Sequence, residues 1–70
     1  MKYALVAHDD TYAAYTYYEG VRTLTYDPYI VELFDTLEDA AIALEADKRF
    51  VGIEPVVDEQ EFRSRKVMTW

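Results

Sequence analysis

The chain has 70 residues and a formal net charge of −7, from 14 acidic side chains against seven lysines and arginines. A chain of this length forms one domain with a small core, and the absence of cysteine excludes disulfide bonds that would support it. An acidic field repels nucleic-acid phosphates, so we expect no direct nucleic-acid binding and favour a basic protein surface as the partner. Solubility alone is the other explanation of such a charge.

The apolar runs of the sequence are short. The first one ends at His8, and none approaches the roughly 20 residues that span a bilayer. We therefore expect no membrane segment and a cytoplasmic protein, a location that also fits the lack of cysteine.

The first third of the chain predicts an antiparallel hairpin. Residues 2–8, "KYALVAH", alternate in a way that is typical of a strand, and the polar residues 9–11 form a turn. Residues 12–19, "YAAYTYYE", are rich in aromatic side chains and predict the second strand. Residues 21–27 alternate like a strand but are equally compatible with a partial loop.

The second half predicts a strand, a helix and a short strand. Residues 29–34, "YIVELF", are nearly continuous in apolar character, which indicates a central strand. Thr36 is a good helix N-cap, with Asp39 three residues later, and Gly52 suits the position just after the helix. The apolar face of this helix is expected at Leu37, Ala40, Ala41 and Leu44. Residues 53–57 form the last strand, where Pro55 indicates a sheet edge.

These elements predict an α+β fold: a small antiparallel sheet of three to four strands with one helix packed on one face. We expect a single compact domain over residues 1–61 and a basic tail over residues 62–70, either disordered or docked. One helix leaves the other sheet face open. Tyr15 and Tyr17 are then candidate aromatic anchors on the open face, for a partner or for a homodimer, unless they pack into the core.

The residue types that carry catalysis are scarce. His8 with Asp9 and Asp10 is more readily explained as a solvated turn than as a metal site, because adjacent residues point in different directions. Ser64 is the only serine, and the only glycines, Gly20 and Gly52, form no phosphate-binding loop. We therefore expect no enzyme, no metal and no cofactor.

The acidic residues offer a different chemistry. Glu38, Asp39 and Glu45 lie off the apolar face of the predicted helix, so we expect them to be exposed. Carboxylates on a rigid scaffold can imitate the phosphates of a nucleic acid and occupy a basic channel. Glu32 and Glu54, on the flanking predicted strands, are the other candidates for such a surface.

The segment from residue 29 to residue 57 resembles the small acidic inhibitors of host bacterial RNA polymerase encoded by podoviral coliphages. The matching residues are Thr36, Leu37, Glu38, Asp39, Ala40, Gly52 and Glu54. The resemblance implies a small sheet crossed by one helix, and polymerase binding through a strip of acids that includes Glu54. The arginines on the last strand of that family have no counterpart, since Val57 and Glu59 stand in their places.

The sequence thus favours a non-enzymatic, phage-derived inhibitor that binds the basic surface of a host nucleic-acid machine, with RNA polymerase as the first candidate. An anti-CRISPR or anti-restriction nucleic-acid mimic, and a homodimeric structural or assembly protein, remain the alternatives. The expected partner-binding residues are Glu32, Glu38, Asp39, Glu45, Glu54, Tyr15 and Tyr17.

Overall fold

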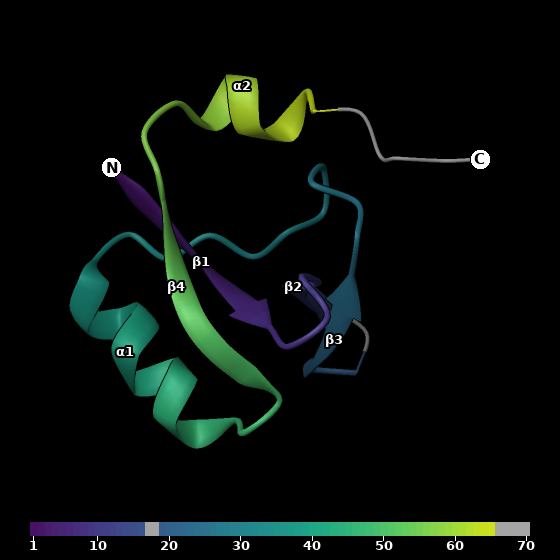
Figure 1. Ribbon diagram of the computed structural model, residues 1–70, viewed down its shortest axis with the longest axis vertical. Coiled ribbons are helices and arrows are strands. Elements are labelled where there is room, and N and C mark those ends of the chain that lie inside the picture. The colour runs from purple at the N-terminus through teal and green to yellow at the C-terminus, as the bar shows by residue number, and fades with distance from the viewer. Residues whose placement is uncertain (17–18, 66–70) are drawn as a thin grey trace.

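The computed structural model describes residues 1–16 and 19–65. Its strands are β1 (Lys2–Ala7), β2 (Tyr12–Thr16), β3 (Val21–Thr25) and β4 (Phe50–Val56), and its helices are α1 (Leu37–Ala46) and α2 (Glu59–Arg63). The strands form one antiparallel sheet in the order β3-β2-β1-β4, with α1 packed alongside β1 and β4 (Figure 1). The predicted α+β fold is confirmed.

Residues with positive φ mark the connections that follow β1 and β2. The carboxylate of Asp9 accepts hydrogen bonds from the backbone N–H and the hydroxyl of Thr11, which lets Asp10 adopt a positive φ of 66°. Gly20, with φ of 64°, provides the left-handed residue that leads into β3. The sequence left the structure of residues 21–27 open, and most of this segment forms β3.

The expected strand over residues 29–34 is wrong. This segment is irregular and forms only an isolated bridge, in which Phe34 and Tyr3 of β1 exchange backbone hydrogen bonds of 2.7 and 3.0 Å. On its other side Glu32 N–H donates to the Ala13 carbonyl of β2 at 2.8 Å. The segment is thus hydrogen-bonded to both β1 and β2, which pair with each other only near Val6 and Tyr12. Its apolar run reflects burial, and burial does not require a strand.

Helix α1 begins as predicted and ends early. The Thr36 hydroxyl accepts from Asp39 N–H at 3.1 Å, which completes the N-cap. The helix ends at Ala46 because the Asp47 carboxylate binds both the backbone N–H and the guanidinium of Arg49, a local arrangement that competes with helix. Gly52 therefore lies in β4 and does not terminate the helix.

The buried face of α1 also differs from the expected one. Ala40 and Ala43 are buried, and Leu44 packs against the same core cluster. Leu37 is 54% exposed and Ala41 is exposed. The contact therefore keeps Ala40 and Leu44 of the expected face, and Ala43 takes the place of Leu37 and Ala41.

Both faces of the sheet are covered, contrary to our expectation of one open face. The first core cluster lies under α1 and contains Leu5, Ala7, Ala13, Ala40, Ala43 and Phe50. The second lies on the opposite face and contains Ala4, Val31, Val56 and Phe62. Phe62, which is 1% exposed, reaches this cluster from α2. The domain boundary expected at residue 61 therefore falls inside α2, and residues 66–70 of the expected tail lie outside the described residues.

Strand β4 has one neighbour, β1, so the edge position that Pro55 predicted is confirmed. Within the described residues, neither helix has the length and apolar character needed to cross a membrane.

Candidate protein-interaction surface

Most basic side chains in the described part of the chain contact acidic neighbours. The ion pairs join Lys2 to Asp35, Arg22 to Glu32, Arg49 to Asp47, Arg63 to Glu59, and Arg65 to both Glu54 and Glu61. The carboxylates without an ion pair among the described residues are Asp9, Asp10, Glu19, Asp27, Glu38, Asp39, Glu45 and Asp58. The net negative charge of the protein therefore resides on these mostly exposed side chains.

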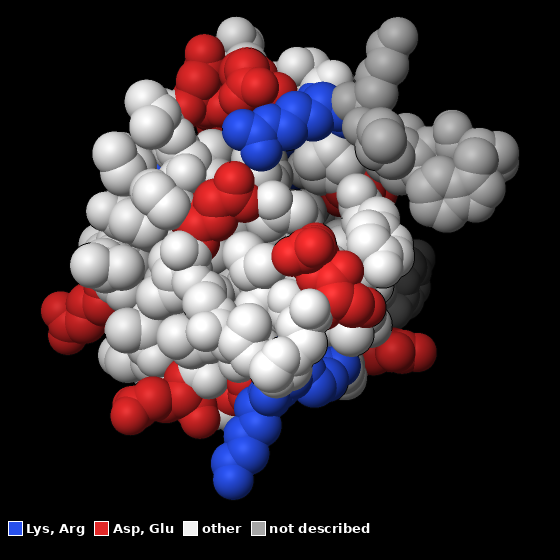
Figure 2. All heavy atoms as spheres, in the orientation of Figure 1, with Lys and Arg blue, Asp and Glu red and all other residues white. Residues whose placement is uncertain are grey.

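Three of the five expected acidic contacts belong to this outward set. Glu38 and Asp39 lie in the first turn of α1, where the helix dipole favours anions, and Glu45 lies near its end. Spacings of four and three residues place Glu38, Ile42 and Glu45 on one side of the helix. On the face shown in Figure 2, acidic side chains form separate groups with uncharged surface between them, so a continuous acidic strip is absent from this view.

Glu32 is largely buried and is paired within the protein. Its carboxylate accepts from the Arg22 guanidinium at 2.8 and 3.3 Å, and its side chain is only 19% exposed. The same guanidinium lies 5.5 Å from the centre of the Phe34 ring. Glu32 thus joins the irregular segment to β3, and its charge is neutralised within the protein.

Glu54 is also engaged internally. It accepts a hydrogen bond from the Tyr12 hydroxyl, and Arg65 lies 3.6 Å away on its other side. Burial, followed by the bond to Glu54, raises the pKa of Tyr12 to about 12. The hydrogen bond and the ion pair with Glu61 raise the pKa of Arg65, so this base stays charged. Glu54 therefore holds β2, β4 and the end of α2 together.

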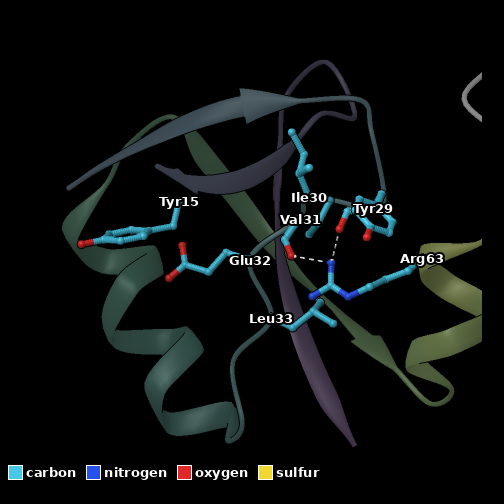
Figure 3. Close-up of a pocket in the computed structure, with 7 residues that line it drawn as sticks. All are labelled: Tyr15, Tyr29, Ile30, Val31, Glu32, Leu33 and Arg63. Atoms are coloured by element: carbon cyan, nitrogen blue, oxygen red, sulfur yellow. Dashed lines mark hydrogen bonds between the residues drawn. The ribbon is translucent and has the colours of Figure 1, made fainter. Parts of the chain in front are cut away.

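Tyr15 lines a groove on the surface. The groove has a volume of about 400 Å³ and is lined by Tyr15, Tyr29, Ile30, Val31, Glu32, Leu33 and Arg63. Tyr15 is 46% exposed and Tyr29 is 73% exposed. Figure 3 shows Tyr15 beside Glu32 at one end, with Tyr29, Ile30 and the Arg63 side chain at the other. Tyr17 lies outside the described residues.

The face on which Tyr15 lies differs from the expected one. Tyr15 stands opposite Arg22, and Ala13, two residues before it, belongs to the core cluster under α1. Tyr15 is therefore on the α1 side of the sheet, beyond the part that the helix covers. The sequence analysis missed Tyr29 and Ile30 because it assigned them to a strand, although the preceding Asp27-Pro28 pair signals a turn.

Arg63 fixes the other wall of the groove. Its guanidinium donates to the carbonyls of Pro28, Tyr29 and Val31 at 3.3, 2.8 and 3.0 Å (dashed lines to Tyr29 and Val31 in Figure 3). A further bond reaches Glu59 at 3.3 Å. These contacts tie α2 to the irregular segment, so the charge of Arg63 is used to hold the fold.

The turn at Asp9 and Asp10 has the geometry of an ordinary turn. The hydrogen bond from Thr11 lowers the pKa of the Asp9 carboxyl. Across residues 1–16 and 19–65, no three side chains of the metal-binding types lie close enough together to hold an ion.

Comparison with known proteins adds no relative: no protein-family model, curated protein or solved structure matches this chain.

Proposed function

We propose that this protein is a non-enzymatic, phage-derived inhibitor that acts in the bacterial cytoplasm by binding the basic surface of a host nucleic-acid machine. RNA polymerase is the first candidate. The proposal assigns the contact to the outer side of α1, with Glu38, Asp39 and Glu45 as its acidic residues.

The observation that carries the proposal is the separation of charge in the fold. Lys2, Arg22, Arg49, Arg63 and Arg65 are held in ion pairs, whereas the α1 carboxylates form no ion pair among the described residues. Uncompensated surface charge steers a partner of opposite sign and sets the specificity of the encounter more than its affinity. A basic surface that normally holds DNA or RNA fits this requirement.

Polymerase is placed first because of the residues that resemble the phage inhibitor family, above all those at the start of α1, residues 36–40. Glu54, the strip acid implied by that resemblance, is bound by Tyr12 and Arg65, so we assign it to the fold rather than to the contact. A CRISPR or restriction nuclease complex presents the same chemistry and is the second candidate target.

The test measures binding of the full chain to purified bacterial RNA polymerase at low and at high salt. We expect binding that weakens steeply with salt, because exposed charges are screened beyond about 10 Å at 0.1 M ionic strength. Glu45→Lys should weaken binding by about tenfold or more, since it places like charges together at the contact.

Glu19→Lys is the matched control, because it makes the same change of charge in the β2–β3 turn. A modest, salt-sensitive effect at Glu19 and a large effect at Glu45 support contact through α1. Equal effects would contradict the α1 contact. Binding of neither polymerase nor a purified nuclease complex would overturn the proposed function.

A further inference from the structure

The outer edge of β4 presents backbone groups that β1 does not use. Tyr3 directs both its N–H and its carbonyl to Phe34, away from β4, so Tyr3 and Pro55 form a pair without mutual hydrogen bonds. The alternation of an antiparallel ladder gives the same geometry to the pair of Leu5 and Ile53. The N–H and carbonyl of Ile53 and the carbonyl of Pro55 therefore point to the free edge.

The surface near this edge carries exposed apolar side chains. Figure 1 shows α1 alongside β4, and Figure 2 shows much of the surface over these two elements without charged side chains. Leu37 and Ala41 of α1 are exposed beside the buried stripe of the helix, and Val51 of β4 is 51% exposed. An edge strand next to a helix is the arrangement at which an extended peptide adds to a sheet.

The two edges of the sheet differ. At β3 the outward carbonyl of Arg22 accepts from the Arg49 guanidinium at 2.7 Å, so this edge is already covered in part. Among the described strands, β1 is the only one that pairs with β4. The free edge available to a partner is therefore the β4 edge.

We propose that an extended segment of the partner, with alternating apolar and basic residues, binds as a fifth strand along β4. This inference rests on the proposed function, because the net charge of −7 is what selects a basic segment. The same charge disfavours a second copy of this chain. A symmetric pair of β4 strands would also lose a ladder hydrogen bond at each Pro55, which has no N–H to donate.

The test uses amide hydrogen exchange of the full chain followed by NMR, with a capped peptide of about eight alternating valines and lysines as the probe. Ile53 N–H should exchange about tenfold more slowly at saturating peptide, because it gains a hydrogen bond. Leu24 N–H is the matched control: Ala13 directs its carbonyl to Glu32, so Leu24 also points outward, but from the β3 edge. A peptide of alternating valine and glutamate controls for charge.

Slower exchange at Ile53 alone, with the lysine peptide only, supports strand addition. Peptide binding that shifts α1 resonances and leaves Ile53 exchange unchanged would overturn strand addition while the acidic-surface proposal stands. Absence of peptide binding would also overturn it, and the polymerase assay would then decide the proposed function separately. If protection of the Ile53 N–H from exchange increased with protein concentration in the absence of peptide, the edge would bind a second copy, and the inference would be refuted.

Discussion

Phe62→Ala should destabilise this protein more than any change on its surface. Phe62 is 1% exposed, and its ring meets that of Tyr12 edge-on at 5.5 Å between centroids. The Arg65 guanidinium lies 4.9 Å from the centre of the same ring. Truncating a buried phenylalanine costs about 3–5 kcal/mol, and removing the ring also removes both of these contacts. A domain of this length has about 4–10 kcal/mol of stability in total, so the variant should be close to unfolding.

Thermal and urea denaturation followed by circular dichroism measure this loss. A loss of about 3 kcal/mol lowers Tm by roughly 12–24 °C in a domain of this size. Phe62→Leu is the graded control and should lose about 1–1.5 kcal/mol, because it keeps most of the buried volume. If Phe62→Ala melted within a few degrees of the unchanged protein, then α2 would not close the second core cluster, and the sheet face would be open after all.

Three further changes test the contacts that hold the chain together, each by urea denaturation. Thr36→Ala should cost about 1 kcal/mol through loss of the α1 N-cap; an unchanged midpoint would contradict the cap. Glu32→Gln should cost about 1–2 kcal/mol by breaking a half-buried pair, yet leave salt-dependent partner binding intact. Burial and the bond to Glu54 raise the pKa of Tyr12 to about 12, so its contribution is complete below about pH 10, the unfolded value, and is lost as pH rises through 12. The unchanged protein should lose about 1–2 kcal/mol of stability over this pH range, and Tyr12→Phe should not show this loss.

The sequence predicted those elements whose signals are local. The start of α1 followed from Thr36 and Asp39, and the first two strands followed from alternation on either side of a polar turn. The irregular segment at 29–34 and helix α2 depend on distant contacts. A continuous apolar run records burial but not conformation, and the single apolar residue Phe62 in a charged stretch gave no helical period to detect.

The residues of the candidate site also divide into those with a local signal and those that depend on distant contacts. Exposure of Glu38, Asp39 and Glu45 could be predicted because these positions lie off both the expected apolar face of the helix and the one that the structure buries. Sequence could not separate Glu32 and Glu54 from this group. Their partners stand elsewhere in the chain, and only the fold brings a guanidinium to each carboxylate.

The same contacts that remove two acids from the candidate surface also determine where a partner can bind. Phe62 and the segment around Val31 cover the sheet face that α1 leaves open. Arg63 holds that segment in place by donating hydrogen bonds to the carbonyls of Tyr29 and Val31. A partner that displaced α2 to reach this face would have to expose Phe62, and loss of a buried phenylalanine costs about 3–5 kcal/mol. Two surfaces that are accessible without unfolding are the outer side of α1 and the edge of β4, one offering charge and the other backbone hydrogen bonds. Charge reversal on α1 should consequently act mainly on the rate of association, and loss of the Ile53 hydrogen bond mainly on the rate of dissociation.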